Sequence, residues 1–75
     1  MTKTDPAKIA KARAAASNGE GRALRLKNRL SLSEVASVCE VDQSAVWRWE
    51  QGERAPRAAA AIRYANLLDI LRGLT

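Results

Sequence analysis

The stretch from Ser31 to Pro56, SLSEVASVCEVDQSAVWRWEQGERAP, constrains the fold more than any other part of this 75-residue chain. It begins with a capping box, in which the Ser31 hydroxyl accepts from the Glu34 N–H and the Glu34 carboxylate accepts from the Ser31 N–H. Apolar residues then follow at helical spacing as far as Cys39. The pattern predicts a helix that begins at about Leu32 and ends near Cys39.

A second short helix is expected over Gln43–Gln51, with Asp42 as its N-cap and Gly52 just beyond its end. Val46 and Trp49 lie three residues apart, which is the spacing of a buried stripe. The connection between the two predicted helices is so short that they must cross steeply. The stretch therefore predicts a helix-turn-helix arrangement.

The segment before this motif divides into two parts. Residues 1–18 predict a basic N-terminal extension, helical from its Asp5 cap and ending at Asn18-Gly19. This extension is either a basic arm that touches phosphates or a mobile, solvated terminus. Residues 19–75 are expected to form the helix-turn-helix domain, which begins with a helix at about Glu20–Asn28.

The last predicted helix runs from about Pro56 to Arg72 and ends at Gly73. One apolar face is expected to be buried and consists of Ala58, Ala61, Tyr64, Ala65, Leu68 and Leu71. A second apolar face consists of Leu67, Ile70 and Leu74. This second face is either a homodimer interface or is covered by the basic N-terminal helix.

The composition agrees with a small all-α bundle of four to five helices with a central helix-turn-helix. Much of the 47% apolar content is alanine, a strong helix former, and aromatic residues make up only 4%. The formal net charge of +5 and the pI near 10.2 suggest a polyanionic partner, nucleic acid first and an acidic membrane surface second. The charge also has a simpler interpretation, which is that it only keeps the protein soluble.

Several classes of function are disfavoured. The sequence has no histidine and a single cysteine, Cys39, which we expect to be a small buried apolar residue rather than a reactive thiol. Zinc binding, an internal disulfide and histidine-based catalysis therefore do not fit, and we expect neither an enzyme nor a cofactor. No apolar run has the length of a membrane span and no signal peptide is recognisable, which predicts a cytoplasmic protein.

Residues from Ser31 to Pro56 resemble the helix-turn-helix of phage repressor and Cro-type (XRE-like) proteins. The resemblance rests on Leu24-Arg25, Leu30-Ser31-Leu32-Ser33-Glu34-Val35-Ala36, Val41, Val46-x-Arg48-Trp49-Glu50-x-Gly52-Glu53-Arg54-x-Pro56, Tyr64-Ala65 and Leu68. Two positions depart from the family pattern: Glu40 stands in the turn where glycine is usual, and Leu32 stands where a DNA-contacting glutamine is frequent. The resemblance implies a lambda-repressor-like fold whose second motif helix enters the major groove of DNA.

The same resemblance implies a set of DNA-contacting residues. The expected base contacts are the outward positions of the second motif helix, namely Gln43, Ser44, Trp47, Arg48 and Gln51. The motif itself is acidic, so phosphate contacts are expected chiefly from its flanks, namely from Arg22, Arg25, Lys27, Arg29, Ser33, Arg54 and Arg57. Glu50 is expected to be a structural partner of a nearby arginine, and Trp47 either contacts DNA or packs beside the basic helix around Arg25.

The functional hypothesis is a sequence-specific transcriptional regulator, most simply a phage-type repressor or Cro-like protein in a bacterial host. It would bind double-stranded operator DNA as a homodimer, without a membrane or a small-molecule ligand. The alternative is a protein-interaction module with a helix-turn-helix fold, such as an antitoxin or an adaptor.

Overall fold

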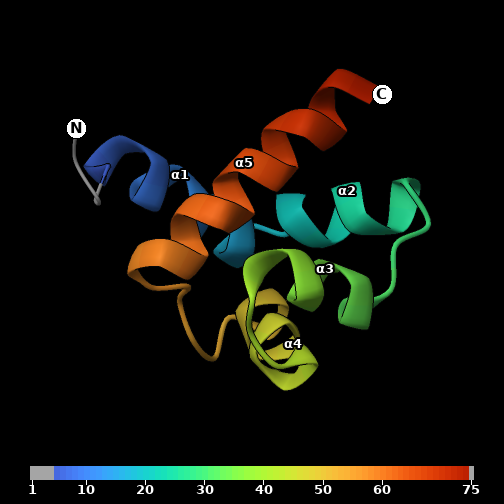
Figure 1. Cartoon of the computed structure of the whole chain (residues 1–75), viewed down its shortest axis with the longest axis horizontal. Coiled ribbons are helices and arrows are strands. Elements are labelled where there is room, and N and C mark those ends of the chain that lie inside the picture. Colours follow the sequence, from blue (N-terminus) through green and yellow to red (C-terminus); the bar gives the residue numbers. More distant parts are fainter. Residues whose placement is uncertain (1–4, 75) are drawn as a thin grey trace.

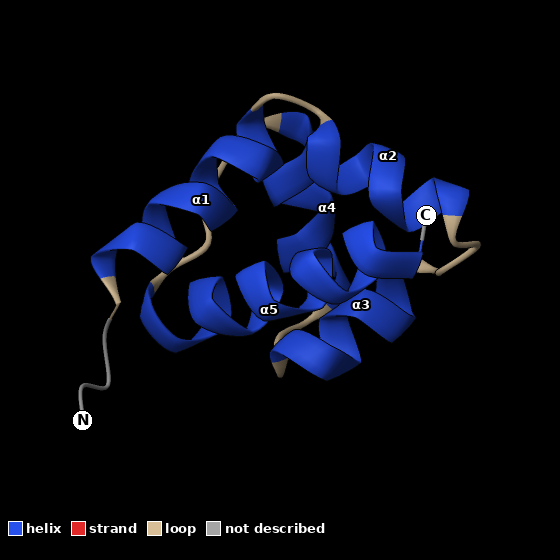
Figure 2. Cartoon of the chain, turned by 90° about the horizontal axis from the view of Figure 1, so that it is seen from above, coloured by secondary structure: helices blue, strands red, loops and turns tan. Residues whose placement is uncertain are grey.

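The computed structural model describes residues 5–74, which form an all-α bundle without strands (Figure 1). The described helices, in chain order, are α1 Pro6–Ser17, α2 Glu20–Lys27, α3 Leu32–Cys39, α4 Gln43–Gln51 and α5 Ala58–Leu74. Short loops connect them (Figure 2). The predicted fold class is confirmed, including the central pair of short helices, α3 and α4. None of the described helices has both the length and the apolar character that crossing a membrane requires.

Helix α1 begins as predicted, because the Asp5 carboxylate accepts from two N–H groups of the first turn and Pro6 occupies the first helical position. The helix packs against α5 and crosses it (Figure 1). Ala12, Ala15 and Ala16 are buried against it, and their small side chains allow the two helices to approach closely. Residues 6–17 are therefore docked rather than solvated, while residues 1–4 of the predicted extension lie outside the described residues. The domain boundary at residue 18 stays a prediction.

The core lies where α3, α4 and α5 meet. Val35, Val46, Tyr64 and Leu68 are among its largest fully buried side chains, and the Tyr64 ring packs against the Trp49 ring with centroids 5.0 Å apart. Cys39 is completely buried, and burial raises the pKa of its thiol to about 11. The expectation that Cys39 is a small buried apolar residue is confirmed.

The start of the last helix was predicted wrongly. Helix α5 begins at Ala58 rather than at Pro56, which is fully buried in the preceding loop. The Pro56 carbonyl accepts a hydrogen bond of 3.0 Å from Arg13 Nε and is thereby held by α1. Ala58 is exposed and has a φ of 41°, so it does not belong to the buried face.

The end of the last helix was also predicted wrongly. Gly73 lies inside α5, which continues to Leu74. An ion pair of 2.7 Å between Arg72 Nε and Glu20 Oε2 joins the last turns of α5 to the start of α2. This pairing lowers the pKa of the Glu20 carboxyl, chiefly through the hydrogen bond from Arg72. Such a tertiary contact outweighs the penalty of roughly 1 kcal/mol for a helical glycine.

Candidate nucleic-acid interface

Helix α3 begins with the predicted capping box. Ser31 N donates to Glu34 Oε1 at 2.8 Å, and Glu34 N donates to Ser31 Oγ at 3.0 Å. Hydrogen bonds from Ser31 lower the pKa of the Glu34 carboxyl, the bond from its backbone N–H having a larger effect than the one from its side chain. They also leave the N–H groups of Leu32 and Ser33 directed out of the helix start, where an anion is favoured.

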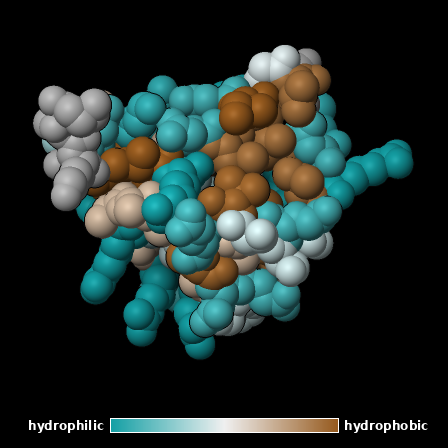
Figure 3. Space-filling view, viewed as in Figure 1, coloured by the Kyte–Doolittle hydropathy of each residue, from teal (hydrophilic) through white to brown (hydrophobic). Residues whose placement is uncertain are grey.

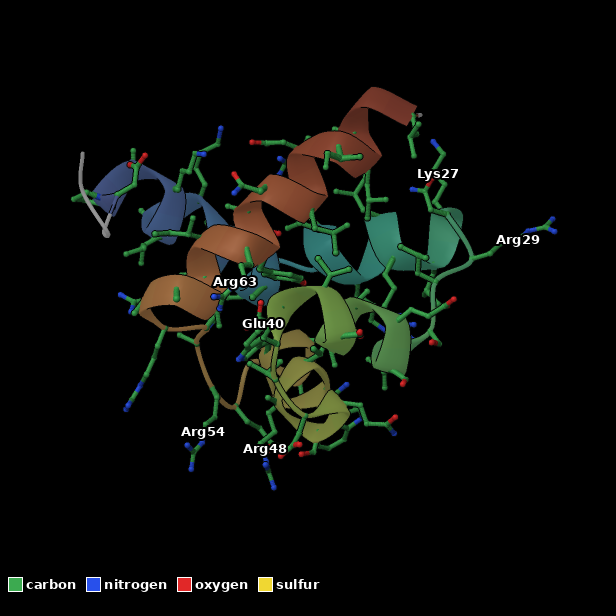
Figure 4. The ribbon with its side chains drawn as sticks, viewed as in Figure 1. Lys27, Arg29, Glu40, Arg48, Arg54 and Arg63 are labelled. Atoms are coloured by element: carbon green, nitrogen blue, oxygen red, sulfur yellow. The ribbon has the colours of Figure 1, made fainter. Side chains whose placement is uncertain are left out.

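The turn between α3 and α4 adopts the conformation that glycine favours. Glu40 has φ 61° and ψ 45°, in the left-handed region, and its carboxylate lies 3.6 Å from Arg63 Nε, with both side chains exposed (Figure 4). Val41 N donates to Ala36 O at 3.0 Å, which closes the turn. Asp42 occupies the predicted N-cap position of α4, but its side chain makes no capping hydrogen bond.

The inner side of α4, formed by Val46, Trp49 and Glu50, is fixed to the rest of the molecule. Val46 and Trp49 are buried in the core, and the Glu50 side chain is only 2% exposed. Arg25 donates to both Glu50 carboxylate oxygens, at 2.6 and 2.9 Å, and to Leu30 O at 3.0 Å. The hydrogen bond to Glu50 raises the pKa of Arg25. The expectation that Glu50 has a structural arginine partner is confirmed.

The outer side of α4 carries the five predicted base contacts. All five side chains are exposed, and within residues 5–74 none makes a hydrogen bond or ion pair; they are Gln43, Ser44, Trp47, Arg48 and Gln51. Trp47 is 44% exposed, which leaves much of its indole ring in contact with solvent. The outer side therefore presents amide, hydroxyl, guanidinium and indole groups that a partner can contact.

The predicted phosphate contacts do not form one continuous surface. Arg25 is withdrawn from the set, because its guanidinium is held by Glu50 and its side chain is only 12% exposed. Figure 4 shows Arg48 and Arg54 projecting on the same side of the molecule, below α4. Arg29 projects sideways and Lys27 lies near the end of α5 (Figure 4). Both lie away from Arg48, so both are also withdrawn.

The remaining predicted phosphate contacts are all exposed, and they are Arg22, Ser33, Arg54 and Arg57.

Sequence reasoning missed the structural role of Arg13. Arg13 lies in the predicted basic extension, and its Nε donates to Pro56 O, which holds the loop that carries Arg54 and Arg57. The partners lie 43 positions apart, and no local pattern indicates such a pairing. Sequence reasoning also left open whether the second apolar face of α5 is covered. Ile70 is 61% exposed, so the N-terminal helix does not cover it.

Comparison with known families agrees with this geometry. A family model described as a helix-turn-helix domain matches residues 22–75, which begin at α2 and include α3, α4 and α5. This chain belongs to the helix-turn-helix domain family. The family comprises XRE-like DNA-binding domains, which are typically not enzymes. No curated protein and no solved structure matches the chain significantly.

Helix α1 lies outside the matched residues, whereas α3 and α4 lie within them. Membership in the helix-turn-helix domain family indicates that the protein is a DNA-binding regulator. Within the described residues, no group of histidine, cysteine, aspartate or glutamate side chains is arranged to hold a metal ion.

Proposed function

We propose that the protein is a sequence-specific transcriptional repressor of the phage-repressor or Cro type, which inserts α4 into the major groove of operator DNA. The observation that carries this proposal is the contrast between the two sides of α4. Its inner side is held by Arg25 and the core, while its outer row of polar side chains has no partner among the described residues. Helices held in this way read base edges in the major groove.

Each outer residue has a proposed role. Gln43 matches the donor and acceptor of adenine, and Arg48 matches the two acceptors of guanine. Ser44, near the start of α4, and Gln51, at its end, contact bases or phosphates. The exposed Trp47 ring offers an apolar surface to a thymine methyl group or a sugar.

The affinity is proposed to come from residues around α4. The segment from Leu32 to Gly52 contains four carboxylates and only one arginine, so it repels DNA on balance. Arg22, Arg54 and Arg57 are exposed on the flanks, and the start of α3 adds N–H groups at Ser33. Neutralising phosphates in this way makes binding steeply dependent on salt.

The proposal is tested by fluorescence anisotropy with an operator selected from a random DNA library, at several salt concentrations. The logarithm of the binding constant should fall linearly with the logarithm of salt, by about 0.9 for each phosphate contact. A slope near zero, or equal affinity for all sequences, would reject the proposal.

Variants separate base reading from phosphate binding. Arg48→Ala should reduce affinity for the operator by about 1–3 kcal/mol and relax its sequence preference, because the pairing with guanine is lost. Arg54→Ala should weaken binding to all sequences alike and lower the salt slope by about one. Lys27→Ala, which lies away from Arg48 (Figure 4), is the matched control and should leave both quantities unchanged.

We also propose that the protein binds DNA as a homodimer through the C-terminal half of α5. Ile70 and Leu74 are 61% and 70% exposed there, and Figure 3 shows apolar side chains gathered over this part of the surface. Leu67 is removed from the expected interface, because it is partly buried against the core of its own chain.

Sedimentation equilibrium tests the dimer. Ile70→Ser should weaken self-association, whereas Asn66→Ser, also exposed on α5, should not. A selected operator with two half-sites about 34 Å apart would support a dimer on DNA. A protein that stays monomeric in solution and on DNA, yet binds another protein through Ile70, would favour an interaction module instead.

A further inference from the structure

A pocket of about 230 Å³ lies between α4 and the loop that leads into α5. Part of its wall is apolar and comes from the turn, α4 and α5, namely from Val41, Ala45, Trp49 and Ala60. No carboxylate lines it. The proposed DNA contacts do not explain the apolar wall of this pocket.

Three arginines line the same pocket, namely Arg48, Arg54 and Arg57. Within residues 5–74, none of their guanidinium groups makes a hydrogen bond or ion pair. Figure 4 shows Arg48 and Arg54 projecting outward below α4, so their charges stand at the mouth of the pocket rather than inside it. Three unpaired cations at the mouth of one pocket favour an anion. The first turn of α5 contributes Ala60 to the lining, so the positive end of that helix dipole adds to the field.

The size and wall chemistry of the pocket select the kind of anion. An apolar cavity of about 150 Å³ holds one benzene molecule. The pocket is larger than such a cavity, and the additional volume is enough for an acidic group attached to the ring. Its charged lining consists of arginines, which bind carboxylate or phosphate. A single apolar wall with a few converging polar groups is typical of small-molecule sites.

We propose that this pocket binds a small organic anion, with an apolar ring against Trp49 and Ala60 and one phosphate or carboxylate group among the three arginines. This proposal differs from the expectation drawn from the sequence, which was that the protein binds no small-molecule ligand. Because Arg48 and Arg54 are also proposed DNA contacts, the bound anion competes with DNA and releases the protein from its operator. This second part rests on the proposed function, whereas binding of the anion does not.

Binding is tested by NMR titration of the ¹⁵N-labelled full chain with three probes. Phenyl phosphate combines the ring and the anion, inorganic phosphate provides only the anion, and phenol provides only the ring. Phenyl phosphate should shift the amide signals of Val41, Ala45 and Ala60 saturably, and bind about tenfold or more tightly than either other probe. Equal affinity for inorganic phosphate, or the absence of a saturable shift at these residues, would overturn the proposal.

Variants of neighbouring alanines test whether the pocket is the site. Ala60→Leu fills the cavity, and it should weaken phenyl phosphate binding by about tenfold or more. Ala59→Leu, at the adjacent exposed position of α5, should leave binding unchanged. Circular dichroism verifies that both variants are folded. If Ala60→Leu does not fold, Arg57→Gln is used, and unchanged binding by that variant would overturn the proposal.

Competition is measured with labelled operator DNA at constant ionic strength. Saturating phenyl phosphate should raise the apparent Kd for DNA about tenfold or more, and it should have no such effect on Ala60→Leu. If phenyl phosphate binds the pocket and the Kd for DNA does not change, the regulatory part is wrong. If the protein binds no DNA at all, the proposed function fails while the NMR result still decides the ligand site.

Discussion

The inner and outer sides of α4 differ in what holds their side chains. Trp49 on the inner side is 4% exposed and packs on Tyr64, while Trp47, two positions earlier on the outer side, is 44% exposed. Glu50 is held by Arg25 at two oxygens, whereas Arg48 has no side-chain partner in the described part of the chain. The inner side determines how α4 is oriented, and the outer side supplies the groups available to a partner.

The difference also shows how an acidic motif is compatible with DNA binding. The most deeply buried of its carboxylates, Glu50, is paired with Arg25 and does not face the outer side. The exposed Glu40 lies beside Arg63, away from the Arg48 end (Figure 4). None of the five outward side chains of α4 is therefore a carboxylate, although the motif has a negative formal charge and the exposed Asp42 stands at the N-cap of the helix.

The two tryptophans provide the largest expected contrast. Trp49→Ala should lower the free energy of unfolding by about 3–5 kcal/mol, because it removes a buried ring from the core. Trp47→Ala should lower it by less than about 0.5 kcal/mol and act mainly on DNA binding. Urea denaturation measures both. Similar losses of stability in the two variants would show that the sides of α4 are not divided as described.

The buried ion pair provides the next contrast. Arg25→Met should lower the free energy of unfolding by about 3 kcal/mol, because it leaves the buried Glu50 carboxylate without its main partner. Arg22→Met is the matched control, since Arg22 lies 4.0 Å from Glu50 with its side chain 56% exposed, and it should cost less than about 1 kcal/mol. Thermal denaturation of both variants decides whether the pair with Arg25 is the one that holds α4.

Gly21 tests the packing behind Tyr64. A Cβ at Gly21 would overlap the Tyr64 hydroxyl, so Gly21→Ala should cost about 1–3 kcal/mol of unfolding free energy. Tyr64→Phe alone should change stability by less than about 1 kcal/mol, because the buried hydroxyl has no hydrogen-bond partner among the described residues. The double variant should recover part of the loss, as a double-mutant cycle measures. Strictly additive effects would contradict this close contact.

The smallest expected effect is at the turn before α4. Glu40→Gly should raise the free energy of unfolding by about 0.5–1 kcal/mol, because glycine adopts the left-handed conformation without strain. The lost ion pair with Arg63 is exposed and offsets little of this gain. Glu53→Gly, at an exposed loop position without a positive φ, should not stabilise the protein. A loss of stability in Glu40→Gly would show that the Arg63 contact outweighs the strain.

Much of the fold could be predicted because its signals are local. The capping box of Ser31 and Glu34 joins residues three apart, and the burial of Val46 and Trp49 follows from helical spacing. The five outward positions of α4 follow from the same spacing, and all are exposed. The boundaries of α5 could not be predicted in this way, because Pro56 and Arg72 are held by residues from distant helices.

The sequence by itself determined the first four helices, the caps at Asp5 and Ser31, and the two sides of α4, since each depends on residues within a few positions of one another. Only the tertiary structure decided that Arg25 belongs to the interior, that Arg13 holds the loop at Pro56, and that three arginines surround one pocket. Ion pairs and pockets depend on which helices pack together. That packing joins segments far apart in the chain, and no local pattern of residues records it.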